Sequence, residues 1–364
     1  MSSLTLASKL HAVPWTPETS ADFLARMPKV ETHVHLDGTL SPATILRLAK
    51  AQSYAPLSAK TEEELRRLAV VSDPRESLAA VLKAFETFYP LLKTAHALEL
   101  VARELLAAAA RENVRYVEVR YAPALNAAPG FSERHSLEAV LKGLKAGEKA
   151  TGVGWGVILC LFRGHDLKAN EAVLDLAATF QSRGVAGVDL AGDEGRHPLK
   201  DAAELFRAAK SIGLATTVHA GEVSGSSDLE LALELGIDRI SHATLLAEKP
   251  ALAAEIAKRG VSIETNLTSN VRTGAVRRLK DHPARGWFER GIRITPSTDD
   301  PGVFGITLTG EYALMKDELG FTVPELAQVT LQGIEALFLD AAGKKALRAR
   351  FERELDWLLD SFKA

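Results

Sequence analysis

Short β-branched runs alternate along the chain with longer segments of helical periodicity. Eight of these runs are typical of buried strands, at residues 30–35, 114–123, 152–162, 184–192, 214–222, 238–244, 261–270 and 292–300. Amphipathic or alanine-rich stretches separate them, and most end in a glycine that suits a helix C-terminus. A strand–helix unit repeated eight times predicts an α/β fold of the TIM barrel type, (β/α)8.

Two regions are additional to the eight strand–helix units of a minimal barrel. Residues 41–112 form a mostly helical insertion after the first strand, and residues 311–364 add helices after the last. We expect residues 1–364 to form a single domain, because no linker rich in proline, glycine or serine divides the chain. An insertion that follows a barrel strand lies over the catalytic face, so residues 41–112 are a candidate lid.

Composition limits the possible partners. The net charge is −3 and basic residues are interspersed among acids, so we expect no nucleic-acid partner. The start of the chain lacks the features of a signal peptide, and no stretch has the roughly 18 consecutive apolar residues of a membrane helix. We therefore expect a cytoplasmic protein with no membrane partner. The single cysteine, Cys160, lies in an apolar run and is predicted to be buried.

Polar side chains collect where four of the predicted strands end, which is the catalytic end of this fold. The first strand ends in His33 and His35, the fifth in "HAGE" (219–222), the sixth in "SHAT" (241–244) and the eighth in "STDDP" (297–301). With one cysteine in the chain, a metal would be held by histidine and acidic side chains.

These residues predict a hydrolytic metal site. His33 and His35 point the same way in an extended strand, and with His219 and one carboxylate they would make a nitrogen and oxygen shell that suits zinc. Zinc lowers the pKa of a bound water from about 15.7 to roughly 7, which favours hydrolysis. Glu222 is placed to pass a proton to the substrate, and His242 can orient or activate the water.

The two adjacent aspartates, Asp299 and Asp300, would divide their roles, one on the metal and one toward the substrate. The fourth strand ends in "GVDLAGDE" (187–194), without a lysine that could be carbamylated to bridge two metals, so we expect one metal per chain. The other histidines lie in predicted loops or on polar helix faces and are expected to be mostly solvated: His11, His96, His135, His165, His197 and His282.

Six motifs together resemble the adenosine deaminase family of metal-dependent amidohydrolases. In chain order they are "PKVETHVHLDGTLSP" (28–42), "GVDLAGDE" (187–194), "HAGE" (219–222), "RISHAT" (239–244), "LTSN" (267–270) and "STDDPGVFG" (297–305). The resemblance implies one zinc ion on His33, His35, His219 and Asp299. It implies that Glu222 donates a proton to purine N1, that His242 and Asp300 flank the attacking hydroxide, and that Asp300 also meets N7.

The resemblance also implies how the substrate is held. The backbone N–H of Gly192 would meet purine N3, and His35 would face the substrate as well as the metal. Asp37 matches the acid that reaches the ribose 5′-hydroxyl in adenosine-specific members, and Phe85 of "FETFYP" (85–90) is the candidate lid contact, although an ordinary packed helix face explains it equally well. The implied reaction converts adenosine or 2′-deoxyadenosine to inosine or deoxyinosine and ammonia.

Two departures bear on the substrate. Thr39 replaces the alanine of the usual "HVHLDGA", and "IETNLTSN" (263–270) lacks the cysteine–proline pair that precedes Ser-Asn in many members. The alternatives are therefore 6-amino-6-deoxyfutalosine, a menaquinone-pathway nucleoside, and adenine or N6-substituted AMP. The sequence does not choose between a monomer and a homo-oligomer.

Two other classes of protein fit parts of the pattern. Polynuclear phosphoesterase barrels also begin with His-x-His, but they need more histidines and acids at strand ends than this chain supplies. A barrel that binds a nucleoside without turnover would not need Glu222, His242 and Asp300 together. Ammonia release from a purine nucleoside separates the deaminase from both.

Overall fold

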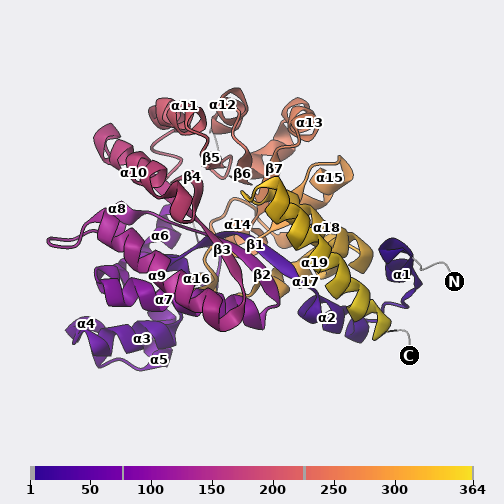
Figure 1. The fold of residues 1–364 in the computed structure, drawn as a ribbon, viewed down its shortest axis with the longest axis horizontal. Helices are drawn as coiled ribbons and strands as arrows, with labels where there is room; N and C mark the ends of the chain where they lie inside the picture. Colours follow the sequence, from indigo (N-terminus) through magenta and orange to yellow (C-terminus); the bar gives the residue numbers. More distant parts are fainter. Residues whose placement is uncertain (1–4, 76–77, 224–226, 363–364) are drawn as a thin grey trace.

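The computed structural model describes residues 5–75, 78–223 and 227–362. Its centre is a parallel sheet of eight strands in chain order. The strands are β1 (Lys29–His35), β2 (Val114–Tyr121), β3 (Gly154–Phe162), β4 (Val185–Ala191), β5 (Ala215–Ala220), β6 (Arg239–His242), β7 (Ser262–Thr265) and β8 (Ile294–Pro296). Helices surround this sheet on its outside (Figure 1). The predicted TIM barrel is therefore confirmed.

The barrel closes just beyond the last strand. Asp299 pairs with Val34 of β1 as an isolated parallel bridge. The Asp299 N–H donates to the His33 carbonyl at 2.9 Å, and the His35 N–H donates to the Asp299 carbonyl at 2.8 Å. The first and last strands are thus joined at the position where His33, His35 and Asp299 stand.

The connection between β1 and β2 carries most of the extra structure. It contains α3 (Pro42–Ala51), α4 (Ala55–Ser58), α5 (Glu62–Ala69), α6 (Leu78–Glu86), a 3-10 turn at Tyr89–Leu92 and α7 (Ala95–Arg111). The predicted helical insertion is confirmed in these described residues. Its last helix, α7, packs on β2 and α9, as a regular barrel helix does, so the additional part is the segment before α7.

The remaining connections each carry helices. They are α8 (Pro123–Asn126), α9 (Glu133–Thr151), α10 (Leu167–Phe180), α11 (Ala203–Ser211), α12 (Asp228–Glu234), α13 (Pro250–Arg259), α14 (Leu267–Arg272) and α15 (Ala284–Glu289). After β8 come α16 (Pro301–Phe304), α17 (Leu308–Leu319), α18 (Val323–Ala336) and α19 (Ala341–Asp360). The expected C-terminal helices are confirmed, and α18 packs on β8 and β1 to complete the outer layer.

Two parts of the fold were not predicted. Helices α1 (Leu6–Ala12) and α2 (Pro17–Arg26) precede the barrel and lie with α19 on one side of the molecule (Figure 1). The strand expected over 261–270 ends at Thr265, and its second half is wrong because Leu267–Arg272 is helical. None of the helices in the described part of the chain combines the length and apolar character that crossing a bilayer requires.

Candidate active site

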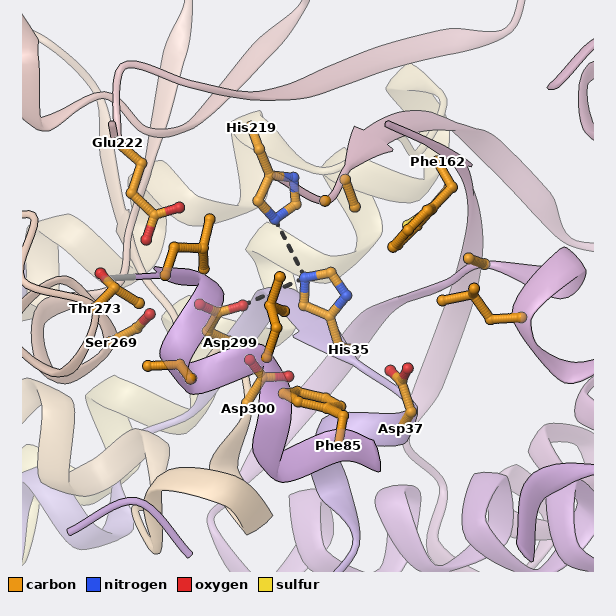
Figure 2. A pocket seen from close by; sticks show the side chains of 18 of the residues that line it. His35, Asp37, Phe85, Phe162, His219, Glu222, Ser269, Thr273, Asp299 and Asp300 are labelled. Carbon is orange, nitrogen blue, oxygen red and sulfur yellow. Dashed lines mark hydrogen bonds and ion pairs between the residues drawn. The ribbon is translucent and has the colours of Figure 1, made fainter. Parts of the chain in front are cut away.

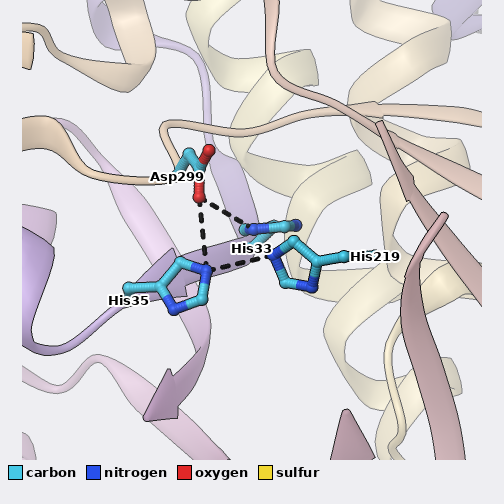
Figure 3. A group of neighbouring side chains, drawn as sticks. All are labelled: His33, His35, His219 and Asp299. Atoms are coloured by element: carbon cyan, nitrogen blue, oxygen red, sulfur yellow. Dashed lines mark hydrogen bonds and ion pairs between the residues drawn. The ribbon is translucent and has the colours of Figure 1, made fainter. Parts of the chain in front are cut away.

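Four side chains from three parts of the barrel meet at its carboxyl end. His33 and His35 come from β1, His219 from β5 and Asp299 from the segment after β8, and one ligand atom of each lies within 4.8 Å of all the others. Asp299 Oδ1 is 3.0 Å from His33 Nε2 and 3.3 Å from His35 Nε2. His35 Nε2 is 3.2 Å from His219 Nε2 (Figure 3). The predicted ligand set is therefore brought together.

Two buried carboxylates stand behind these histidines. Glu264 Oε2 accepts from His33 Nδ1 at 2.8 Å, and Asp189 Oδ2 is 3.0 Å from His219 Nδ1. Protons held on the Nδ1 atoms leave the Nε2 lone pairs directed inward, toward Asp299 and His35. Electron-pair donors at these separations repel one another unless a cation lies among them. The donor set therefore fits a divalent metal such as zinc, which prefers imidazole and carboxylate ligands.

A buried arginine keeps the two carboxylates behind the histidines, Asp189 and Glu264, charged. Arg120 of β2 donates to Asp189 at 3.1 Å and to Glu264 at 2.8 Å, and all three side chains are fully buried. Burial favours the neutral acid, but His219 and Arg120 outweigh it and hold the pKa of Asp189 below its usual value. Burial likewise opposes ionisation of Glu264, yet Arg120 and Arg239 hold its pKa well below the usual value.

The backbone is strained at two of the predicted site residues. His242 has φ of 64° and Asp299 has φ of 60°, in the left-handed region that residues with a Cβ rarely adopt. His242 ends β6 and Asp299 stands three residues after the end of β8, and both side chains line the cavity of the site. Strain of this kind persists where the surrounding structure enforces it, as at catalytic positions.

A cavity of about 170 Å³ opens beside the four ligands. The remaining predicted site residues, Asp37, Phe85, Gly192, Glu222, His242 and Asp300, all line it together with His35, His219 and Asp299. In Figure 2, Glu222 and Asp37 lie on opposite sides of His35 and Asp300. Phe85 comes from α6 in the insertion, so this segment forms part of the cavity wall.

Three carboxyl groups on this cavity each have a buried oxygen without a hydrogen-bond partner: Asp37 Oδ1, Glu222 Oε1 and Asp300 Oδ1. Burial raises the pKa of Glu222 to about 8, with Asp299 adding to the effect. Burial and the neighbouring Asp299 also raise the pKa of Asp300 well above its ordinary value, and burial raises the pKa of Asp37. With a pKa of about 8, Glu222 is protonated near neutral pH and can donate a hydrogen bond.

Local contacts fix two of these carboxyl groups. Glu194, from the end of the "GVDLAGDE" motif, accepts the backbone N–H groups of Gly221 at 2.7 Å and Glu222 at 3.0 Å. It also accepts the N–H of Val223 at 3.1 Å, so the turn that carries Glu222 is held by one carboxylate. Asp300 packs against Gly38, where a Cβ atom would lie 1.8 Å from Asp300 Oδ1, so only glycine leaves room there.

Comparison with known proteins places this arrangement in a family. The family model of adenosine deaminase matches residues 28–353. An adenosine deaminase of Lacticaseibacillus casei is 37% identical over 331 residues, which are 91% of this chain and 97% of that protein. The chain belongs to the adenosine deaminase family. It is therefore a hydrolase that acts on carbon–nitrogen bonds, in a family that depends on metal.

Solved structures of adenosine deaminase relatives share the whole fold. An amidohydrolase from Burkholderia ambifaria with bound zinc aligns with a TM-score of 0.84 at 27% identity, over 96% of each chain. An Arabidopsis N6-mAMP deaminase aligns with a TM-score of 0.82 at 25% identity, over 91% of this chain and 99% of its own. The likeness extends over the barrel and the helices that surround it.

One expectation about the other histidines is wrong. His11, His96 and His135 are exposed and His165 and His197 half-buried, but His282 is only 4% exposed. It packs edge-on against the Trp287 ring at 5.7 Å, and burial lowers its pKa to about 3. The predicted burial of Cys160 is confirmed.

Several residues that shape the site were not predicted. Asp189 interrupts an otherwise apolar strand, which is a signal that the sequence does contain, whereas Glu264 stands between Ile263 and Thr265 in a strand with other polar residues. Tyr89 donates its hydroxyl to Asp37 Oδ2 at 2.7 Å, and Asn270 contacts His242. No sequence signal pairs Tyr89 with Asp37, since the contact forms across 52 residues of chain.

Proposed function

We propose that this chain is a zinc-dependent deaminase of 6-aminopurine nucleosides, which converts adenosine or 2′-deoxyadenosine to inosine or deoxyinosine and ammonia. One observation supports the proposal most directly. Three carboxyl oxygens without partners face one cavity beside a cluster of three histidines and an aspartate. Buried polar groups are usually paired, so unpaired ones around a cavity indicate where a polar ligand binds.

The protonation of these carboxyl groups suits a purine. Ring nitrogens N1, N3 and N7 of adenine only accept hydrogen bonds, so each needs a donor. Glu222 and Asp300 have raised pKa values and can supply two protons, to N1 and N7. The backbone N–H of Gly192, a residue that lines the cavity, would serve N3. A proton given by Glu222 to N1 makes carbon six more electrophilic.

The proposed metal is one zinc ion per chain, held by His33, His35, His219 and Asp299. When bound there, zinc supplies a nucleophile by lowering the pKa of water. The chain's own residues do the rest of the work. His242 Nε2 lies 3.7 Å from Glu222 Oε2 and 4.0 Å from Asp299 Oδ2, so it faces the space where water and substrate would meet.

The walls of the cavity favour a nucleoside over a nucleotide. Among the described residues that line it there is no lysine or arginine to neutralise a phosphate group. Asp37 has one oxygen bonded to Tyr89 and the other free, which suits a single ribose hydroxyl. The apolar side chains Leu78, Val81, Leu82 and Phe85 of α6 would cover the sugar. We expect α6 to move as a lid when substrate enters.

The test is release of the 6-amino group by the zinc-loaded protein from adenosine, 2′-deoxyadenosine, adenine, N6-methyl-AMP and 6-amino-6-deoxyfutalosine, ranked by kcat/KM. The leaving amine is methylamine for N6-methyl-AMP and ammonia for the other four, so the assay follows formation of the 6-oxopurine product. We expect a nucleoside to rank first. A higher kcat/KM for adenine would contradict the role given to Asp37, and one for N6-methyl-AMP would contradict the argument from the missing cations. No 6-oxopurine product from any of the five would refute the proposed activity.

The variant Glu222→Gln tests the proton donor. Loss of a general acid should lower kcat by roughly 10²- to 10⁴-fold. Elemental analysis should still find one zinc per chain, because Glu222 is not among the four ligands. Full activity in this variant would contradict the role of Glu222, and two tightly held metals in the wild type would contradict a single-metal site.

A further inference from the structure

His282 is buried close to the site although it lines neither the cavity nor the ligand cluster. It stands just before α15, and its ring is enclosed against Trp287. Its Nδ1 accepts the backbone N–H of Ala284 at 3.2 Å. A backbone N–H can only donate, so the one proton of the neutral ring must be on Nε2.

The proton on His282 Nε2 orients the next side chain. Nε2 is 3.0 Å from Asn270 Oδ1, and the N–H therefore donates to this oxygen. The opposite orientation of the Asn270 amide would place two donors face to face. The Asn270 NH₂ group is thereby directed toward His242, whose Nδ1 lies 2.9 Å from Nδ2.

We propose that His282 is a positioning residue which, through Asn270, fixes His242 as the tautomer that carries its proton on Nε2. The amide N–H donates to His242 Nδ1, so Nδ1 must be unprotonated. The remaining ring proton is then on Nε2, the atom that faces Glu222 and Asp299. His242 meets the reacting groups as a hydrogen-bond donor, which can hold the oxygen that adds to carbon six.

The surroundings of Asn270 support this orientation of its amide, with the NH₂ group toward His242. Its backbone is held in place, since its N–H donates to the Asn266 carbonyl at 2.9 Å and its carbonyl accepts from Val276 at 2.8 Å. Asn266 Nδ2 lies 3.3 Å from His242 Nδ1 and 3.4 Å from His33 Nδ1, so it is shared between two rings, and the Asn270 amide makes the shorter contact with His242 Nδ1, at 2.9 Å.

The tautomer can be read directly by ¹⁵N NMR of the zinc-loaded protein labelled at histidine nitrogens, with the His242 signals assigned by their loss in His242→Gln. We expect Nε2 protonated and Nδ1 unprotonated in the wild type. A wild-type His242 with its proton on Nδ1 would overturn the proposal. The NMR measurement is independent of the proposed function. If His242 carries its proton on Nε2 but the protein releases no ammonia, the proposed tautomer is confirmed and only the proposed activity is refuted.

Variants of His282 separate positioning from packing. His282→Phe fills the space without a donor, so His242 should populate both tautomers and kcat should fall about tenfold with KM little changed, as expected for the loss of one buried hydrogen bond. His282→Gln offers an amide donor near the position of Nε2, so the single His242 tautomer and the wild-type kcat should both be restored. Trp287→Phe, the packing control, keeps the donor and should leave the tautomer as in the wild type.

A second variant keeps the proposal testable if His282→Phe does not fold. Asn270→Asp replaces the amide donor by an acceptor, so the proton of His242 should move to Nδ1 and kcat should fall by on the order of a hundredfold or more, because the wrong tautomer now faces the substrate. An unchanged His242 tautomer in Asn270→Asp and in His282→Phe would overturn the proposal.

Discussion

The carboxylates behind the histidines should govern how tightly zinc is held, and Asp189→Asn tests this most directly. Asp189 is fully buried and its Oδ2 is 3.0 Å from His219 Nδ1. The amide keeps an oxygen that can accept the Nδ1 proton but removes the negative charge. Loss of such an outer partner typically weakens metal binding 10- to 100-fold, which is about 1.4 to 2.8 kcal/mol.

The fold should survive this change. Arg120, which also pairs with Asp189, keeps its contact with Glu264 at 2.8 Å, so the substitution leaves no buried charge without a partner. The measurement is zinc affinity by competition with a chelator of known affinity, at one pH and ionic strength, with secondary structure checked by circular dichroism.

Glu311→Gln is the matched control. Glu311 is also a buried carboxyl group, 1% exposed, and its side chain accepts from the N–H of Thr268 at 3.1 Å and from its hydroxyl. No hydrogen bond or ion pair links the Glu311 side chain to the ligand histidines within the described residues. The control should keep the wild-type zinc affinity. Equal zinc affinity in Asp189→Asn and the wild type would contradict the role given to Asp189, and so would equal losses of affinity in Asp189→Asn and Glu311→Gln.

Four further expectations follow from single contacts. Tyr89→Phe removes the donor to Asp37 Oδ2 and should raise KM for adenosine roughly tenfold, the effect of one buried hydrogen bond, with kcat little changed in steady-state assays. Gly38→Ala should displace Asp300 and lower kcat while elemental analysis still finds zinc; unchanged kcat would contradict the close packing. Because Glu222 must be protonated to donate and its pKa is about 8, kcat/KM should decline above about pH 8, and a flat profile to pH 9.5 would count against its role as donor. Burial lowers the pKa of His282 to about 3, against about 6.5 in the unfolded chain, so the free energy of unfolding decreases as the pH falls from 6.5 toward 3. At pH 5 this decrease is about 2 kcal/mol in the wild type, and chemical denaturation should show that it is absent in His282→Gln.

The strand and helix pattern predicted the barrel because short β-branched runs alternate with amphipathic or alanine-rich helical stretches. The ends of strands were harder to predict. The run "VSIETNLTSN" continues with residues that are common in strands, yet α14 begins at Leu267. A contact distant in sequence holds the first turn of this helix, because the buried Glu311 side chain accepts the Thr268 N–H and hydroxyl.

The candidate ligands could be collected from the sequence because the fold itself brings them together. Parallel strands all end on one side of a barrel, so His33, His35, His219 and Asp299 had to meet once the barrel was predicted. Their roles as metal ligands stay a prediction. The residues that orient them were not found, because Asp189 and Glu264 stand one layer deeper, where only the register between strands shows which histidine each carboxylate reaches.

His282 shows why the sequence misjudged one histidine. A histidine followed by proline between two short helices is typical of an exposed loop, and no local pattern marks it as buried. Its burial depends on a partner twelve residues away, Asn270, whose amide needs an acceptor on one side and a donor on the other. An exposed His282 would leave this amide free to rotate, and His242 would lose the hydrogen bond that decides which of its nitrogens carries the proton. The buried position of His282 is the one from which its Nε2 proton reaches Asn270 Oδ1.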